Sequence, residues 1–170
     1  SIASNSGTTA DVNAIAGDTT GVVTAGISDN DISTLSGLTT LATDAITVTV
    51  TDASVAASAL TSLDGKTSVA VDASAVATIT GATADVATAI QSVGVTTNSG
   101  YDVTLSAGSS TAADLVAITY STTGTVDASS VTTITGTAVE IVTALQSGGI
   151  TTAADYSATV NSGTATVVQA

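Results

Sequence analysis

The densest group of side chains that could do chemistry is the acidic segment Ser28-Asp29-Asn30-Asp31. Carboxylate and amide oxygens are the ligands that Ca²⁺ takes in proteins, which makes Asp29 and Asp31 candidate calcium ligands. The same residue types also accept hydrogen bonds from the free N–H groups at the start of a helix. Under that second interpretation, which we favour, Asp29 or Asn30 caps a short helix that begins near Ile32. No cofactor other than Ca²⁺ is a candidate.

The composition argues against catalysis. The chain contains neither His nor Cys, and its only cation is Lys66. It therefore lacks the commonest general base, the commonest transition-metal ligands and the most nucleophilic side chain. Lys66 lies in the segment DGKTS, which is typical of a solvated turn, and the acidic residues are spread one per turn or loop. We predict that the protein is not an enzyme and has no catalytic residues.

Three further sets of polar side chains occupy positions where a ligand could bind. Asp72 and Asp127 hold equivalent places in a repeated segment, where they could bind cations between repeats or, as we favour, form turns. Alternating threonines at 47–51 could present hydroxyls to ice, although Thr is also common on any exposed strand face. Tyr101 and Tyr156 are predicted to pack their rings with the hydroxyl at the edge, and glycan stacking is the weaker alternative.

Charge and hydropathy exclude two classes of partner. The chain has 170 residues, a formal net charge of −13 and a single Lys or Arg. It cannot neutralise phosphates, so nucleic acid is excluded, and anionic membrane surfaces would repel it. No apolar run approaches the roughly 20 residues of a membrane-spanning helix, so we expect no membrane insertion.

Most of the chain is an internal repeat with a period of 55 residues. Residues 71–101 and 126–156 align without gaps and agree at 17 of 31 positions. A third copy is recognisable near the start, where TADVNAIAGDTTGVV at 9–23 is similar to AADLVAITYSTTGTV at 112–126. A repeat of this length indicates one supersecondary unit that buries its apolar face against neighbouring copies.

Within one period the hydrophobic spacing alternates between two and about 3.6 residues. Ser54 is predicted to cap the first helix and Gly65 to end it, while Val93 belongs to the buried face of the second helix. Gly81 and Gly136 are predicted to allow the same tight chain reversal in successive repeats. The predicted elements are strands at 46–52 and 68–72, a short turn at 74–81 with Val76 and Ile79 inward, and helices at 54–65 and 82–94.

Strands that alternate with short helices favour parallel pairing through crossover connections. We predict an α/β fold, a repetitive β/α solenoid with parallel strands and short helices. The alternative is an open doubly wound α/β sheet. The solenoid is favoured because the units repeat and the strands carry a polar face. The repeat array is assigned to 1–156, with about 55 residues per double unit, and a C-terminal strand or hairpin cap to 157–170.

The segments SVAASALTSLDGKTSVAVDASAVATITG and TADVATAIQSVGVT resemble repeats of giant secreted or cell-surface proteins of marine cyanobacteria and related bacteria. Those proteins are grouped loosely with the repeats-in-toxin adhesins. The resemblance is strongest over 53–95 and 112–151, and it implies an extracellular, repetitive, structural role. The chain lacks the Gly-Gly-x-Gly-x-Asp nonapeptide of the calcium-binding toxin repeats, so that mode of calcium binding is not carried over to any residue.

These features together predict a non-enzymatic structural repeat module of an exported bacterial protein, outside the cell or on its surface. The module would form a stiff acidic scaffold that associates with itself or with neighbouring repeats of the same protein, as a filament, sheath or surface layer. The alternative is an adhesin-type module that binds glycan or Ca²⁺, and ice binding is a minor alternative.

Overall fold

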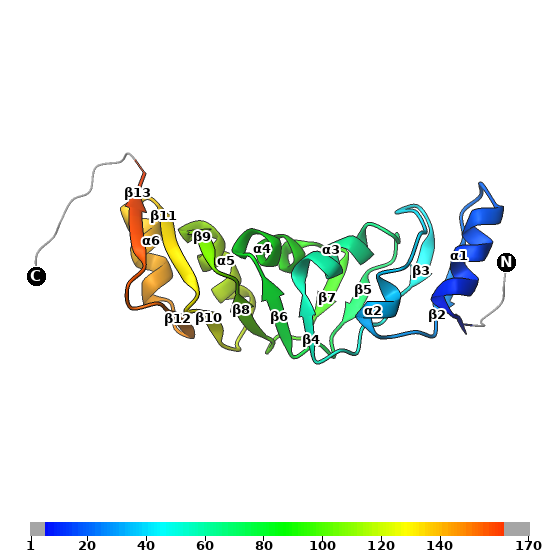
Figure 1. The fold of residues 1–170 in the computed structure, drawn as a ribbon, viewed down its shortest axis with the longest axis horizontal. Helices are drawn as coiled ribbons and strands as arrows, with labels where there is room; N and C mark the ends of the chain where they lie inside the picture. The colour runs from blue at the N-terminus through cyan, green and yellow to red at the C-terminus, as the bar shows by residue number, and fades with distance from the viewer. Residues whose placement is uncertain (1–5, 162–170) are drawn as a thin grey trace, which may run out of the picture.

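The computed structural model describes residues 6–161 as an elongated molecule, with α1 near one end of the long axis and β13 near the other (Figure 1). Short strands alternate with short helices throughout. The helices are α1 (Thr9–Asp18), α2 (Ile32–Leu35), α3 (Ala57–Asp64), α4 (Thr83–Gln91), α5 (Ala112–Ser121) and α6 (Ala138–Gln146). The strands are β1 (Ser6–Gly7), β2 (Thr24–Ile27), β3 (Ala45–Thr47), β4 (Ser54–Ala56), β5 (Val71–Ala73), β6 (Thr78–Gly81), β7 (Val95–Thr97), β8 (Asp102–Leu105), β9 (Gly108–Thr111), β10 (Val126–Ala128), β11 (Val131–Gly136), β12 (Ile150–Thr152) and β13 (Ser157–Val160).

The strand pairings between described residues are parallel and recur at a nearly constant step along the chain. Ser6 is the register partner of Gly26 near the N-terminus, and farther along Val71 is the partner of Val95. We call the stretch that leads from one strand to its register partner a layer. A layer of this length has room for a short helix and two turns, which explains why strands and helices alternate.

The strands form ladders that are staggered along the long axis. The longest ladder has the order β4-β6-β8-β10-β12, and a separate ladder has the order β9-β11-β13. The sheet β1-β2-β3 meets the sheet β5-β7 through a parallel bridge between Thr49 and Asp72. β8 pairs with β6 on one side and with β10 on the other, and β9 then opens the next ladder.

The 55-residue period of the sequence is also the period of the structure. β7 and β8 correspond to β12 and β13, and α4 corresponds to α6, with both ends of each element displaced by the same number of residues. The third copy is equally regular, because α1 and α5 align over their whole length in the register of the sequence match. These elements therefore recur with the spacing of the sequence repeat.

Gly81 and Gly136 both end a strand that leads directly into a helix, so they occupy the same corner, as predicted. Gly81 has a φ of 147°, a conformation that favours glycine. At Gly136 the constraint is space, because a Cβ there would lie 3.0 Å from the Cβ of Ala112. Ala57, the equivalent of Ala112, also faces Gly81, but at 3.7 Å, which is an ordinary van der Waals contact for a Cβ.

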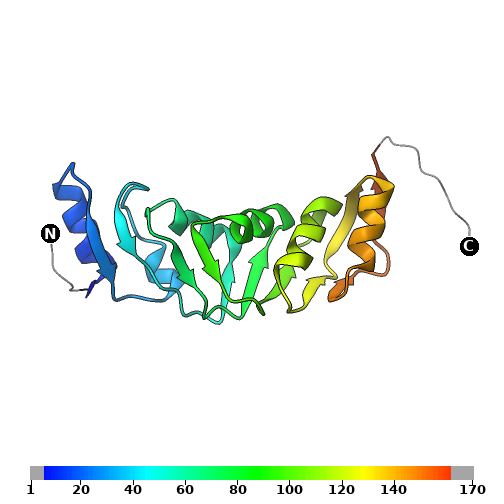
Figure 2. The ribbon, with the colours of Figure 1, turned by 180° about the vertical axis from the view of Figure 1, so that it is seen from behind.

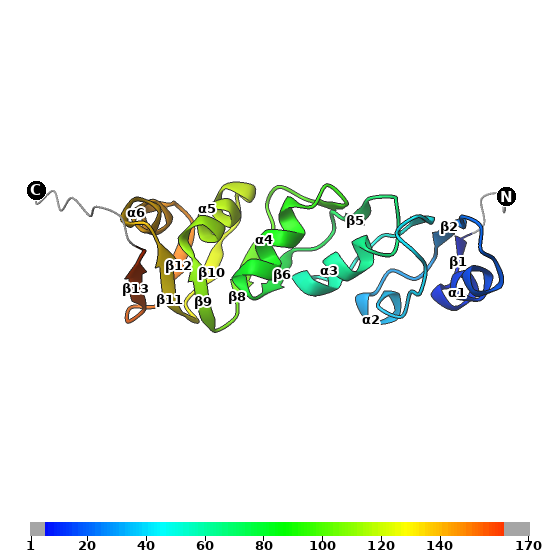
Figure 3. The same ribbon diagram turned by 90° about the horizontal axis from the view of Figure 1, so that it is seen from above.

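The helices α3, α4, α5 and α6 form a single row in which each contacts the next (Figure 3). The view from behind shows the same extended outline, and strands line the molecule beside the helices (Figure 2). The doubly wound alternative requires one open sheet covered on both faces, whereas the described residues form several parallel sheets beside one row of helices. The class is therefore α/β with mostly parallel strands.

The core is a continuous set of small aliphatic side chains that runs through successive layers. Ile46, Val48 and Val50 are fully buried and alternate with exposed or half-buried threonines, as the spacing of two predicted. Val76 and Ile79 are buried, which confirms their predicted inward orientation. Close layers of this kind suit a chain with 2% aromatic residues, because small side chains fill narrow gaps at high density.

Several predicted boundaries are wrong. The helix expected at 54–65 begins at Ala57, because Ser54 starts β4, and its N-cap Ala56 supplies no side-chain hydrogen bond. Gly65 is the C-cap, as predicted. The helix expected at 82–94 ends at Gln91, and Val93 is fully exposed. In the cap at 157–170, β13 pairs in parallel with β11, and the remainder of the predicted hairpin lies outside the described residues.

Candidate functional site

The acidic segment at 28–31 holds the starts of two helices. A short helix does begin at Ile32, but its N-cap is Asp31, whose Oδ1 accepts the Thr34 N–H at 2.9 Å. Asp29 instead accepts the N–H of Thr9 at 2.6 Å, at the start of α1 in the preceding layer. The prediction that Asp29 or Asn30 caps α2 is therefore wrong by one or two positions.

The two candidate calcium ligands thus serve different helices. Hydrogen bonds from the Ser33 hydroxyl and the Thr34 N–H and hydroxyl hold the pKa of Asp31 below its ordinary value. Among residues 6–161, no group of three or more acidic side chains gathers where a metal ion could be held. Calcium therefore keeps only the status of a hypothesis for this segment.

The repeated aspartates form turns within their own layers. Asp72 Oδ1 accepts the hydroxyl of Ser74 at 2.6 Å and its N–H at 3.0 Å, and Asp127 accepts the N–H of Ser129 at 2.9 Å. Hydrogen bonds with the side chain and then the N–H of Ser74 lower the pKa of Asp72, and those with the side chain and N–H of Ser129 lower the pKa of Asp127. Asp72 and Asp127 lie in different ladders, so the geometry fits the turn interpretation better than a shared cation site.

Two buried threonines, which the sequence analysis missed, join successive layers. The Thr67 hydroxyl donates to the Ile46 carbonyl at 2.6 Å and accepts the Ile46 N–H at 3.0 Å. Thr122, one period later, donates to the carbonyl of Tyr101, which is the equivalent of Ile46. Each hydroxyl also accepts the N–H two residues further on, so it fixes the local turn and the neighbouring strand together.

We expect Thr67→Val to lower the free energy of unfolding by about 2 kcal/mol, because a side chain of the same shape leaves buried backbone groups of Ile46 without partners. Chemical denaturation followed by circular dichroism measures the change. Thr88→Val is the matched control, since Thr88 is exposed and its hydroxyl bonds only within α4. A loss for Thr67→Val no larger than that of the control would show that the hydroxyl does not join the layers.

Tyr101 is a buried packing residue. Its side chain is 1% exposed, and its hydroxyl lies 2.6 Å from the Ser121 Oγ. Tyr156, at the equivalent position of the last described layer, is half-buried against the core. The predicted packing of these rings is confirmed, with the qualification that the hydroxyl of Tyr101 is enclosed by α5. A ring buried to this extent offers no face for stacking on a glycan.

Burial raises the pKa of Tyr101, and its hydrogen bond with Ser121 partly opposes that shift. Since the folded protein retains a proton that the unfolded chain releases near pH 10, the free energy of unfolding is expected to fall as the pH rises through that range. Urea denaturation from pH 8 to 11 measures the slope. Tyr101→Phe should flatten it, and an unchanged slope in that variant would contradict the assignment.

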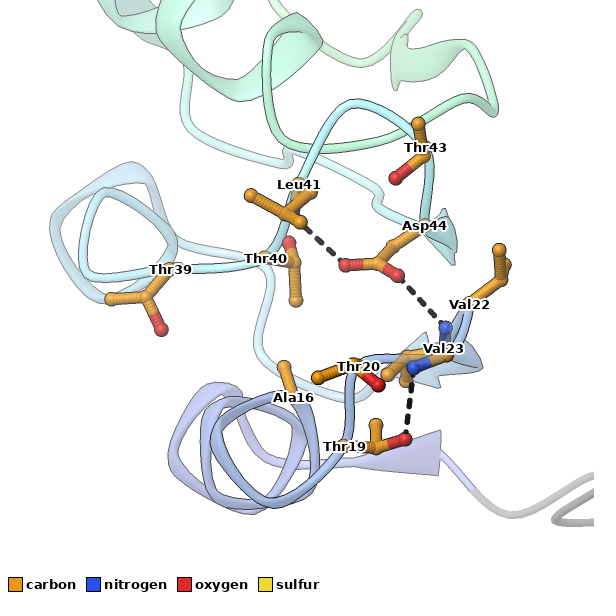
Figure 4. A pocket seen from close by; sticks show the side chains of 11 residues that line it. Ala16, Thr19, Thr20, Val22, Val23, Thr39, Thr40, Leu41, Thr43 and Asp44 are labelled. Atoms are coloured by element: carbon orange, nitrogen blue, oxygen red, sulfur yellow. Dashed lines mark hydrogen bonds between the residues drawn. The ribbon is translucent and has the colours of Figure 1, made fainter.

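A pocket lies at the helix-to-strand corner of the first two layers, between the turn after α1 and the loop before β3 (Figure 4). Asp44 points into it, and its carboxylate accepts the N–H groups of Val23 and Leu41, each at 2.8 Å. The Thr19 hydroxyl accepts the N–H of Gly21 at 3.0 Å. These polar groups are engaged by the backbone around them, so the pocket presents structural turns rather than chemistry.

Hydroxyl side chains line the outer face of the ladder β9-β11-β13. Thr111, Thr135 and Thr159 are register partners in three successive strands. A second column of register partners lies two residues earlier in each of these strands and contains Ser109, Thr133 and Ser157. The threonines at 47–51, which prompted the ice-binding hypothesis, have no such neighbours, since Gly26 and Asp72 are the cross-strand partners of Thr47 and Thr49.

Comparisons with known proteins identify no relative. No protein-family model matches the chain, and no curated protein or solved structure matches it significantly. Between residues 6 and 161 there is no helix with the length and apolar character needed to cross a membrane. Function must therefore be argued from the arrangement of the layers.

Proposed function

We propose that the chain is a non-enzymatic structural module of an exported bacterial surface or extracellular protein. Its layers wind as a β/α solenoid, and their repetition produces a stiff acidic scaffold that associates end to end into a filament, sheath or surface layer. The observation that carries the proposal is the constant register of the parallel ladders. Ser54, Thr78 and Asp102 are partners across three successive layers, as expected where each turn of chain lies on the one before.

The distribution of charge supports a scaffold rather than an enzyme. Asp11, Asp114 and Glu140 lie in the first turns of helices, where carboxylates complement the helix dipole. Asp11 and Glu140 also complete capping boxes with a threonine. The acidic groups thus stabilise helix ends and turns, and together they give the surface the negative charge that keeps such modules soluble.

Small-angle X-ray scattering tests the proposed scaffold. A compact chain of 170 residues has a radius of gyration of about 15 Å. The extended array is expected to give a clearly larger value and a pair-distance distribution with a long tail, both retained after extrapolation to infinite dilution, where the chain is monomeric. A radius of gyration near that of a compact domain would overturn the proposal.

The alternative, an adhesin-type module that binds glycan or Ca²⁺, makes a different prediction. A ligand that binds only the folded state raises the melting temperature by mass action. A rise in millimolar Ca²⁺ that Asp29→Asn and Asp31→Asn together abolish would favour that alternative. The structural proposal expects the same melting temperature with Ca²⁺ or a chelator.

The two hydroxyl columns on β9-β11-β13 make ice binding a second candidate. The face is regular in both directions, although the Thr111 hydroxyl already donates to Asp114 at 2.7 Å. Thermal hysteresis and ice-recrystallisation assays test it directly. Loss of either activity in Thr135→Leu, with folding retained, would support ice binding, and absence of both activities in the native chain would eliminate it.

A further inference from the structure

The C-terminal end of the described array repeats the elements of an interior layer, with no further described layer beyond it. α6, β12 and β13 have the bounds of α4, β7 and β8 displaced by one period. In the interior, Ala87 is 4% exposed and Leu105 is 2% exposed. Their equivalents at the end, Val142 and Val160, are 50% and 48% exposed. In the interior α5 and β10 lie on the C-terminal side of α4 and β8, whereas the described neighbours of α6 and β13, α5 and β11, lie only on the opposite side.

At the N-terminal end a helix equivalent to α5 has no described helix beside it in the place that α4 takes in the interior. α1 repeats α5, including the Thr N-cap that accepts the N–H of an aspartate three residues later. Ile118 of α5 is fully buried, whereas its equivalent Ile15 in α1 is 36% exposed. In the interior α5 packs between α4 and α6, whereas among the described elements α1 packs mainly against β1 and β2 and has no helix of this row beside it.

We infer that the α6 end of one copy of this chain binds the α1 end of a second copy, in the way that α4 binds α5 within the molecule. This inference rests on the proposed scaffold function and specifies its partner. The contact between α4 and α5 in the interior provides the model for both halves. α6 is equivalent to α4 but has no counterpart of α5 beside it, and α1 is equivalent to α5 but has no counterpart of α4 beside it. The covering partner is thus identified by an interface that already exists in the chain.

The same equivalence fixes the register of the strands at the junction. In the interior, Val103 of β8 is the register partner of Val126 of β10. The corresponding residues at the ends are Ala158 of β13 and Val23, which precedes β2. Among the described residues β13 pairs only with β11, and β2 is joined on the side away from β3 by β1 at Gly26 and Ile27 alone. Parallel pairing of β13 of one copy beside β2 of the next copy would therefore continue across the junction the kind of ladder that β8 and β10 form in the interior.

The contact is heterologous, because two different surfaces meet, and repetition of it gives an open chain of copies rather than a closed pair. Both ends carry acidic side chains, with Glu140 near one and Asp11 near the other. Repulsion between them is screened by salt, with a Debye length of about 8 Å at physiological ionic strength. Association is therefore expected to strengthen as salt is raised.

Complementation between two blocked ends tests the inference. The full chain is expected to form concentration-dependent oligomers in analytical ultracentrifugation at moderate salt. Ile15→Glu blocks the α1 end and Val142→Glu the α6 end, so each variant alone should be monomeric. A mixture of the two should form dimers and nothing larger, because each variant supplies the end that the other lacks.

Val93→Glu is the matched control, since Val93 is fully exposed away from both ends, and it should assemble like the native chain. Ala14→Glu and Val160→Glu replace the primary variants if circular dichroism shows either to be unfolded. Oligomers that persist in both single variants, or a dimer of Ile15→Glu alone, would overturn the inference.

A native chain that stays monomeric at all concentrations would also overturn it. In that case a chain truncated after Asn161 would test whether residues 162–170 cover the α6 end. If they do, the truncated chain is expected to associate. Because elongation is measured separately by scattering, a monomeric but elongated chain would refute the contact between copies and leave the stiff, elongated architecture of the scaffold proposal standing.

Discussion

Replacing Tyr101 with Ala is expected to lower the free energy of unfolding by about 3–5 kcal/mol, the largest effect of any single side-chain truncation in this chain. Tyr101 is the largest fully buried side chain in a core made otherwise of small aliphatic residues. Removal of the ring leaves a cavity that Val, Leu and Ile neighbours in close layers cannot fill without moving strands. It also leaves the Ser121 hydroxyl with only its bond to the Ile118 carbonyl.

Two variants separate the ring from its hydroxyl. Tyr101→Phe should cost only about 1 kcal/mol, the typical value of one hydrogen bond. Tyr120→Ala should change the stability little, because Tyr120 is 76% exposed. The measurement is urea denaturation followed by far-ultraviolet circular dichroism. Equal losses for Tyr101→Ala and Tyr120→Ala would contradict the packing described for β8.

Gly124→Ala is expected to lower the free energy of unfolding by about 3 kcal/mol, because it forces two layers apart. A Cβ at this position would collide with the carbonyl oxygen of Tyr101 and lie 2.9 Å from Asp102 Oδ1. The obstacle is backbone in the preceding layer, so no rotation of a side chain relieves it. The same carbonyl accepts the Thr122 hydroxyl, and the strain would weaken that contact too.

Gly148→Ala is the control for this variant, because nothing lies within 4 Å of a Cβ at Gly148. It also occupies a turn before a strand, so it shares the local setting. We expect its stability to match the native chain within about 0.5 kcal/mol. A Gly124→Ala variant as stable as Gly148→Ala would show that the layers are farther apart than described.

The repeat could be predicted from the sequence because identical residues recur at a fixed spacing, and this signal does not depend on weak helix or strand propensities. Matching positions such as Gly81 and Gly136 occupy matching corners, and the alternation of Ile46, Val48 and Val50 gives the buried face of a strand directly. The boundaries could not be predicted as well. Ser54 is as suitable for a helix cap as for a strand. It lies in a strand because it pairs with Thr78 in the next layer, a contact that the local sequence does not show.

The candidate site was predicted only in part, for a related reason. The acidic segment was found from composition, but the partner of Asp29 lies 20 residues away, at Thr9, where no local pattern reveals it. Thr67 and Thr122 carry a signal that was available, since they are identical residues one period apart. Their role depends on contacts with Ile46 and Tyr101 in the preceding layer, which only the register supplies.

Engineered disulfides measure the stacking of layers most directly, because the native chain contains no cysteine. Thr80 and Thr104 are register partners in β6 and β8, and Asp127 lies one strand further along the same ladder. Adjacent partners lie within the Cα separation that a disulfide spans, about 4.4–6.8 Å, whereas residues two strands apart do not. We expect Thr80→Cys with Thr104→Cys to form an intramolecular disulfide under mild oxidation, and Thr80→Cys with Asp127→Cys to stay reduced. The reverse result, or no disulfide in the first pair, would contradict the stacked-layer account.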